Sequence, residues 1–152
     1  MIIYLASDHA GYFLKEKTKQ EYLDKGFVVE DFGAKNFDEV DDYPDFVAPC
    51  VKKFMAITNG DVKKGVCILF GGSGTGEAIV ANRVRGARAV VFNSNNLEIL
   101  KLAREHNNAN ILSVGARLVS EKDFSEGLRV FTTTPFQGER HSKRILKIDL
   151  LT

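Results

Sequence analysis

A glycine-rich segment that ends in a carboxylate is the part of this sequence best suited to chemistry. The residues from Gly65 to Arg83 read GVCILFGGSGTGEAIVANR, so an apolar run leads into four glycines within six residues and then into Glu77. In a strand-to-helix turn of this kind, backbone N–H groups can surround an anion. Glu77 adds a base to that polar turn. The segment therefore predicts anion binding next to a base.

Two nucleotide-binding motifs with glycine-rich turns do not fit. A phosphate loop needs a lysine after its last glycine, whereas Gly76 is followed by Glu77. A dinucleotide fingerprint needs a glycine at its sixth position and an acidic residue at the end of the next strand. Counted from Gly72, the sixth position is Glu77, and the next apolar run ends in Asn93. A simpler interpretation stays open, in which Glu77 only favours the positive N-terminus of a helix.

The elements that must position this turn follow from alternating β-rich and helical patterns. Strands are expected at Ile2–Ser7, Phe27–Phe32, Gly65–Phe70, Arg88–Phe92 and Asn110–Val114. Helices are expected at Ala10–Lys25, Tyr43–Thr58, Glu77–Val84, Asn95–Glu105, Glu121–Phe131 and Glu139–Leu150. Strands and helices that alternate with short connections predict an α/β fold with a parallel sheet covered on both faces.

In open parallel sheets, ligands bind outside the carboxyl ends of the strands, where the strand order reverses. If the first and third strands are neighbours, the loop Ser7–Gly11 faces the loop Gly71–Glu77. That arrangement would bring the carboxylate of Asp8, the imidazole of His9 and the glycine-rich turn into one crevice.

Three further polar clusters lie at Asp41–Asp45, at Arg104–Asn110 and at Gly138–Arg144. Each has a simpler interpretation: a helix start with proline at the first position, a solvated loop histidine, or a solvated basic face. Arg140 and Arg144 are four residues apart, however, and so share one face of a helix, which suits the binding of a phosphate.

Composition limits the partners. The 152 residues fit one domain covering residues 1–152, and 21 lysines and arginines against 20 acidic residues leave no overall charge that would attract nucleic acid or an anionic membrane. The start MIIYLAS runs directly into Asp8, which predicts neither a signal peptide nor a spanning helix. Two cysteines without close spacing, Cys50 and Cys67, fit a cytoplasmic protein whose thiols are packed in the core.

Taken together, these segments resemble the ribose-5-phosphate isomerase type B and galactose-6-phosphate isomerase family of sugar-phosphate isomerases, over nearly the whole chain. The matching motifs are SDHAG at Ser7–Gly11, DYPD at Asp42–Asp45, GGSGTGEAIVANR at Gly71–Arg83, GARA at Gly86–Ala89, REHNNAN at Arg104–Asn110, GAR at Gly115–Arg117 and F-x-G-x-RHxxRI at Phe136–Ile145. The resemblance implies a three-layer αβα sandwich with a Rossmann-like, five-stranded parallel sheet of order 2-1-3-5-4. It also implies a homodimer or a dimer of dimers, with sites between subunits.

The implied reaction interconverts an aldose phosphate and a ketose phosphate through a cis-enediolate. One branch of the family has a cysteine base at the position of Gly71, and another has a glutamate where this chain has Glu77. Cys67, four residues upstream and inside the strand, is not the missing cysteine. Chemistry supports the role of Glu77, since a carboxylate can take the proton while Ser73 and the Gly72–Gly76 amides stabilise the enediolate oxygen.

The resemblance assigns the other roles as well. His106 would open the furanose ring with help from Asp8, Asn107 would hold a sugar hydroxyl, and Tyr43 would line the pocket. His9, Arg117 and, from the neighbouring subunit, Arg140 and Arg144 would bind the phosphate, with His141 nearby. The residues of the turn expected to contact substrate are Gly72, Gly74, Thr75 and Gly76.

An enediolate route needs no metal or cofactor, and we expect neither. His9, His106 and His141 show no paired-ligand spacing on one helix, and the acidic residues do not cluster around them in the sequence. Ribose 5-phosphate is the expected substrate, with a six-carbon aldose phosphate such as galactose or allose 6-phosphate as the alternative. A non-catalytic sugar-phosphate sensor on the same fold is a further alternative, against which Glu77 and His106 argue because binding alone needs neither. This one chain keeps a candidate for every role, which favours a homo-oligomer.

Overall fold

A five-stranded, fully parallel sheet forms the centre of the computed structural model, which describes residues 1–151. Its strands run in the order β2-β1-β3-β5-β4, which is the order that the family resemblance implies. The strands are β1 (Ile2–Ser7), β2 (Val28–Asp31), β3 (Gly65–Gly71), β4 (Ala89–Phe92) and β5 (Ile111–Gly115). Because β1 and β3 are neighbours, the loops that follow them lie side by side at the carboxyl edge of the sheet.

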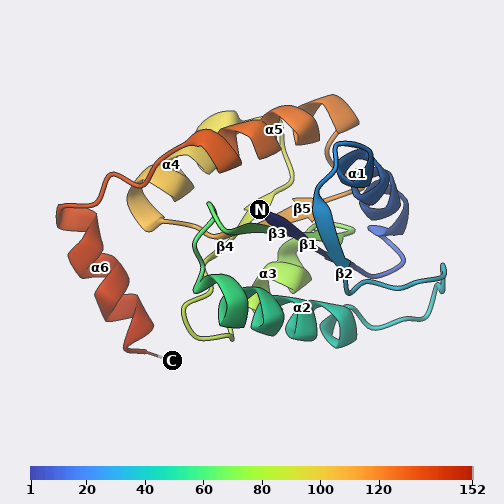
Figure 1. The fold of residues 1–152 in the computed structure, drawn as a ribbon, viewed down its shortest axis with the longest axis horizontal. Coiled ribbons are helices and arrows are strands. Elements are labelled where there is room, and N and C mark those ends of the chain that lie inside the picture. Colours follow the sequence, from blue (N-terminus) through green and yellow to red (C-terminus); the bar gives the residue numbers. More distant parts are fainter. Residues whose placement is uncertain (152) are drawn as a thin grey trace.

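Helices cover both faces of the sheet and make the predicted three-layer sandwich. Within the described residues they are α1 (Tyr12–Asp24), α2 (Tyr43–Thr58), α3 (Thr75–Ala81), α4 (Leu97–Asn107), α5 (Glu121–Thr133) and α6 (Arg140–Asp149). Helices α2 and α3 lie on one face, and α1, α4 and α5 lie on the other (Figure 1). No helix among these residues has both the length and the apolar character that crossing a membrane requires.

The core lies in two layers because side chains alternate between the two faces of each strand. Ile3 and Leu5 point into the cluster shared with α4 and α5, whereas Tyr4 and Ala6 point into the cluster shared with α2. All four side chains are completely buried. Strands buried on both faces read as nearly continuous apolar runs, which is why the sequence predicts them well.

Both cysteines are packed in the core, as the sequence predicts. Cys50 on α2 and Cys67 on β3 are fully buried, and their sulfur atoms lie 3.9 Å apart as free thiols. Burial raises the pKa of the Cys50 thiol well above its ordinary value. A raised pKa suppresses the thiolate, so packing is the role that this environment gives to Cys50.

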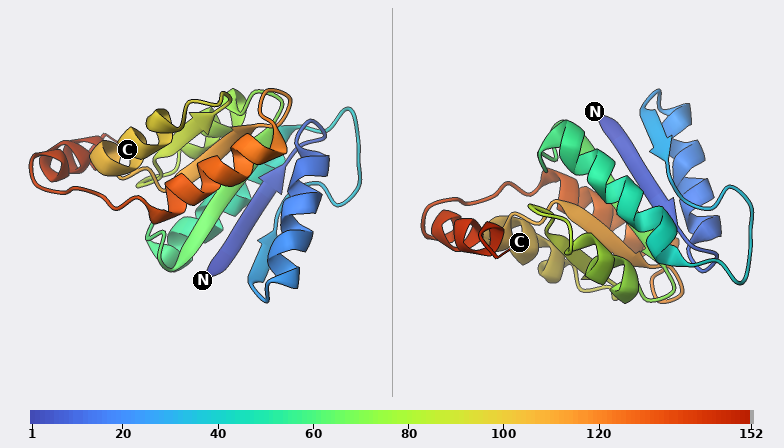
Figure 2. Two further views of the ribbon diagram at one scale, coloured as in Figure 1. Left: turned by 90° about the horizontal axis from the view of Figure 1, so that it is seen from above. Right: turned by 90° about the horizontal axis from the view of Figure 1, so that it is seen from below.

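Helix α6 stands apart from the sandwich. Figures 1 and 2 show it next to α4, at the opposite end of the molecule from α1 and β2. It packs through His141 and Ile145, which are buried, while Leu146 and Leu150 are exposed. The helix therefore leaves exposed apolar side chains that pack against nothing else within residues 1–151.

Most helix boundaries differ from the predicted ones by one to three residues, and two of the differences affect candidate site residues. Helix α4 continues to Asn107 instead of ending at Glu105, because Asn108 is the residue that adopts the left-handed conformation, with φ of 46°, and ends the helix. His106 is therefore helical and does not lie in a loop. Helix α3 begins at Thr75, so Glu77 is its third residue and not its first.

Candidate functional site

The loops after β1 and β3 form the floor of the candidate site. Ser7 pairs with Phe70 at the end of the two strands, so the loop Asp8–Gly11 faces the glycine-rich turn, as the sequence predicts. The approach is close, because a Cβ added to Gly11 would overlap the backbone carbonyl of Phe70. Glycine at this position lets the two loops meet.

Glu77 is buried in this crevice, with only 3% of the residue exposed. Its carboxylate packs against Gly71, and a Cβ added to Gly71 would overlap it. Burial raises the pKa of the Glu77 carboxyl above its ordinary value of 4.5, although its own backbone N–H acts in the opposite direction, and the nearby Asp8 carboxylate raises it further. The side chain is thus a carboxylate that holds its proton more tightly than an exposed glutamate does.

The contact between Glu77 and Gly71 also bears on the two branches that the resemblance describes. A cysteine at position 71 and this conformation of Glu77 would need the same space. A base at one position therefore requires that the other position be vacated, and this chain has glycine at 71 and the carboxylate at 77.

Three further predicted residues, Tyr43, Ser73 and Arg117, belong to the glycine-rich turn or lie against it. A Cβ added to Gly76 would lie 2.8 Å from Cζ of Tyr43, and one added to Gly72 would lie 3.5 Å from Nη1 of Arg117. The Ser73 hydroxyl accepts a hydrogen bond from the backbone N–H of Thr75 at 3.3 Å. The structure therefore brings the aromatic ring, the guanidinium and the hydroxyl to the turn that carries Glu77.

Two aspartates surround His9. The Asp8 carboxylate accepts hydrogen bonds from the backbone N–H groups of Ala10, at 2.9 Å, and Gly11, at 3.3 Å. Asp41 Oδ1 lies 2.7 Å from His9 Nδ1. The sequence pattern predicts no acidic cluster around a histidine, and at His9 that prediction is wrong because the loop before α2 folds over the end of β1. Asp41 is the residue of this site that the sequence pattern missed, since no local spacing links it to a position 32 residues earlier.

Asp8, His9 and Asp41 are also the residues best placed to hold a metal ion, because they offer ligand atoms within 4.8 Å of one another. The contact of 2.7 Å between His9 Nδ1 and Asp41 Oδ1 is, however, that of a direct hydrogen bond. It uses His9 Nδ1 and Asp41 Oδ1, and it leaves His9 Nε2 and Asp41 Oδ2 outside the contact. The geometry therefore fits an imidazole–carboxylate pair.

A second cluster forms where α6 meets α4. The rings of His106 and His141 stack with their centroids 4.4 Å apart and an angle of 7° between their planes. Arg140 donates to His141 from Nε at 3.4 Å, and Arg144 Nη1 lies 3.5 Å from His141 Nδ1. Desolvation lowers the pKa of the His141 ring, and the neighbouring His106 and the two arginines lower it further. The cluster therefore combines an imidazole pair with two permanent positive charges.

The two clusters lie at opposite edges of the sheet. Helix α4 starts beyond the carboxyl end of β4 and ends before the amino end of β5, so His106 and Asn107 lie at the amino edge. Glu77 lies at the carboxyl edge. Strand β5 alone has five residues, which separate the two edges by about 16 Å. A helix between two parallel strands always runs from the carboxyl edge of the sheet to the amino edge. This rule is the signal that could have grouped His106 and Asn107 with Arg140 and Arg144.

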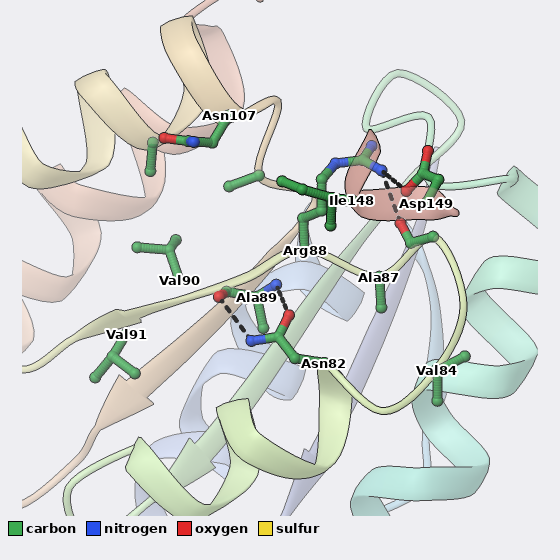
Figure 3. Close-up of a pocket in the computed structure, with 13 residues that line it drawn as sticks. Asn82, Val84, Ala87, Arg88, Ala89, Val90, Val91, Asn107, Ile148 and Asp149 are labelled. Atoms are coloured by element: carbon green, nitrogen blue, oxygen red, sulfur yellow. Dashed lines mark hydrogen bonds and ion pairs between the residues drawn. The ribbon is translucent and has the colours of Figure 1, made fainter. Parts of the chain in front are cut away.

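A cavity of about 460 Å³ runs along the free edge of β4 (Figure 3). Its apolar lining includes Val84, Val90 and Ile148, and Asn107 is at its border. Arg88 on its wall lies 3.4 Å from Asp149 of α6. Glu77, at the carboxyl edge of the sheet, is not among the residues that line this cavity. The cavity is therefore a groove next to the second cluster and not the crevice of Glu77.

The fold defines an α/β protein of the three-layer class, with its candidate base at the carboxyl edge of a parallel sheet. Comparison with known proteins makes the class specific. The chain matches the model of the Ribose/Galactose Isomerase family over residues 3–148. It is 37% identical over 146 residues to ribose-5-phosphate isomerase B of Mycobacterium tuberculosis, which covers 95% of this chain and 86% of the relative.

Solved structures give the same result. The structure of ribose-5-phosphate isomerase B from Mycoplasma genitalium with bound ribulose-5-phosphate superimposes with a TM-score of 0.87 at 37% identity, covering 99% of this chain and 95% of that one. Ribose 5-phosphate isomerase from Thermotoga maritima has a TM-score of 0.85 at 41% identity, covering 98% and 97%. This chain belongs to the ribose/galactose isomerase family, and it is an isomerase. The resemblance of its motifs to that family is confirmed.

Proposed function

We propose that the protein interconverts ribose 5-phosphate and ribulose 5-phosphate through a cis-enediolate, with Glu77 as the base. The observation that carries the proposal is the buried Glu77 carboxylate, packed against Gly71 beside the amides of the glycine-rich turn. Its raised pKa brings a carboxylate closer to the basicity that favours proton transfer near neutral pH. The Ser73 hydroxyl and the turn amides would stabilise the enediolate oxygen.

The interpretation that Glu77 merely favours a helix N-terminus explains less. Glu77 is the third residue of α3, where an acidic side chain does interact favourably with the helix dipole. That interaction is available to an exposed side chain, however. Burial and the nearby Asp8 carboxylate both raise the pKa of Glu77, so the ionised side chain is destabilised where it lies. A residue that only caps a helix would be more stable if it were exposed to solvent.

A complete site needs two copies of the chain. Ring opening by His106, with Asn107 holding a hydroxyl, and phosphate binding by Arg140 and Arg144, with His141 beside them, all belong to the second cluster at the amino edge. Deprotonation by Glu77 belongs to the carboxyl edge. A homodimer, alone or within a dimer of dimers, would combine the first cluster of one copy with the second cluster of the other.

The surface next to the second cluster supports such a dimer. The groove along β4 is lined by valines, and Ile79 on α3 and Ile99 and Leu102 on α4 are exposed. Large apolar side chains that gather around an unpaired strand edge are typical of a surface that another chain covers. We infer that a second copy packs there.

In the assembled site, His9 and Arg117 of one copy and Arg140 and Arg144 of the other would bind the phosphate. Asp8 would assist ring opening, and Tyr43 would line the sugar pocket. The choice of substrate rests on relatives that are named ribose-5-phosphate isomerase B, one of which was solved with bound ribulose-5-phosphate. We place the reaction in cytoplasmic pentose phosphate metabolism.

A substrate panel tests this proposal. Ribose 5-phosphate, allose 6-phosphate and galactose 6-phosphate would be offered to the purified protein at matched concentrations, and aldose and ketose would be followed by NMR. We expect the fastest turnover with ribose 5-phosphate. Faster turnover of a six-carbon phosphate would make the pentose assignment wrong. Binding without turnover of any of the three would favour a sugar-phosphate sensor.

A further inference from the structure

Asp41 is a buried acidic residue for which the proposed reaction has no role yet. It stands in the loop between β2 and α2, and its side chain is only 7% exposed. Its Oδ1 atom accepts a hydrogen bond from the backbone N–H of His9 at 3.0 Å and lies 2.7 Å from His9 Nδ1. Its Oδ2 atom is buried without a hydrogen-bond partner among the described residues. Burying a carboxylate in this way is costly unless a positive charge faces it, and His9 is the residue it contacts.

The contact determines which nitrogen of His9 is free. An ionised carboxylate only accepts hydrogen bonds, so Nδ1 must carry a proton and Nε2 is the nitrogen left for a ligand. The ring is further held by the edge of Phe37, at a centroid distance of 6.3 Å and an angle of 89°. A neutral ring with its proton on Nδ1 presents a lone pair at Nε2, which repels a phosphate oxygen. Only the charged ring donates from both nitrogens.

We propose that Asp41 is a positioning residue that holds the His9 ring with Nδ1 on its carboxylate and Nε2 directed at the phosphate of the substrate. The inference rests on the proposed function, in which His9 is a phosphate ligand. An aspartate on one ring nitrogen fixes the tautomer and the orientation of an imidazole. The other charged group near His9 is Asp8, whose carboxylate accepts hydrogen bonds from the N–H groups of Ala10 and Gly11. Asp41 is the group that contacts the ring directly.

The variant Asp41→Asn separates charge from geometry, because an amide oxygen can still accept both hydrogen bonds. We expect the KM for ribose 5-phosphate to rise about tenfold, the usual worth of a charge-assisted hydrogen bond, while kcat stays within about threefold because Glu77 and His106 are unchanged. The matched control is Asp42→Asn, which removes the same charge one position along the loop. Asp42 is exposed and its side chain forms no cap hydrogen bond, so its KM should match that of the unmodified protein. A fall in kcat at unchanged KM, or no effect in Asp41→Asn, would overturn the inference.

A double variant tests whether Asp41 acts through His9. If it does, adding Asp41→Asn to His9→Gln should raise KM little beyond the effect of His9→Gln alone. Fully multiplicative losses would mean that Asp41 acts independently of His9, and the inference would be wrong.

Nitrogen NMR of the unmodified protein tests the same point without a variant that must fold. Free His9 should carry a proton on Nδ1, and inorganic phosphate or ribose 5-phosphate should shift the resonance of Nε2. A ring with bare Nδ1 and protonated Nε2 would contradict the inference.

The two proposals can fail separately. A phosphate-induced change at His9 in a protein that does not turn over ribose 5-phosphate would support this inference and sink the proposed function. Turnover with an unchanged KM in Asp41→Asn would do the reverse.

Discussion

Glu77 shows how one side chain takes its properties from a neighbour that has no side chain. The carboxylate fills the space that a Cβ on Gly71 would occupy, and this packing keeps it away from water. Burial raises its pKa, which makes the carboxylate a stronger base. The same burial means that ionised Glu77 lowers the stability of the fold. Two predictions follow from these two consequences, one for activity and one for stability.

For activity, Glu77→Gln should keep the fold and substrate binding but lower kcat by about two to four orders of magnitude, the usual contribution of a positioned general base. Cys67→Ser is the control, because Cys67 is buried inside β3 and should leave much more activity. Steady-state kinetics of both purified variants is the measurement. An active Glu77→Gln beside a folded but inactive Cys67→Ser would reverse the assignment of the base.

For stability, the same substitution should raise the melting temperature at neutral pH. The pKa of Glu77 is higher in the folded protein than its ordinary value of 4.5, so the folded state binds the proton more tightly than the unfolded chain does. The stability that this proton contributes is present below pH 4.5 and is lost as the pH rises through the folded-state pKa. Glutamine does not ionise and suffers no such loss.

Melting curves of the two proteins from acid to neutral pH would check this. The variant should melt near the unmodified protein in acid and a few degrees above it at neutral pH. A difference that is constant across the range, or that has the opposite sign, would mean that burial of the Glu77 carboxylate does not cost stability.

At the scale of elements, α1 and β2 are joined by a buried lysine. Lys15 is fully buried, and its ammonium lies 2.9 Å from both carboxylate oxygens of Asp31 and 3.2 Å from the carbonyl oxygen of Ala34. Burial alone would raise the pKa of Asp31, but hydrogen bonds from Lys19 and Lys15 outweigh it and lower that pKa. The pairing fixes the start of the loop that carries Asp41 and leads to Tyr43, the first residue of α2.

Lys15→Met should therefore lower the free energy of unfolding by about 2 kcal/mol, since it removes the buried partner of Asp31 while Lys19 still bonds to that carboxylate. Lys17→Met on the same helix is the control. Lys17 pairs with Glu121 at the surface with 60% of its side chain exposed, so its loss should cost less than about 1 kcal/mol. Urea denaturation of both variants gives the comparison, and equal costs would show that the Lys15 pair adds nothing beyond a surface contact.

The sequence predicts most of these elements but not all of their contacts. Apolar runs such as Gly65–Phe70 predict buried parallel strands because burial on both faces leaves no polar positions. The turn at Gly71–Gly76 and its base are also legible from residue type alone. The sequence predicts an end of α4 at Glu105, two residues too early, because Asn107 and Asn108 are both able to terminate a helix. Only the backbone shows that Asn108 is the residue that ends it. The pairing of His9 with Asp41 depends on the path of a loop, which no periodic pattern records.

At the scale of the whole molecule, the proposed function gives one chain two incomplete sites. Topology separates them, since a helix that follows a parallel strand ends at the opposite edge of the sheet. Helix α6 strengthens the division by stacking His141 on His106, with Arg140 and Arg144 beside His141. A symmetric pair of chains would complete two sites at once, because a two-fold contact that brings Glu77 to the partner's second cluster is repeated by symmetry.

The most direct test of this account mixes two inactive variants, Glu77→Gln and His106→Asn. Each alone should be nearly inactive, and each lesion lies in a different cluster. Unfolding and refolding the two together at equal amounts makes about half of all dimers mixed, and each mixed dimer has one site with both lesions and one with neither. The account predicts that about a quarter of the unmodified activity returns. If mixing restores no activity although mixed dimers form, then Glu77 and His106 act within one chain, and the shared site is wrong.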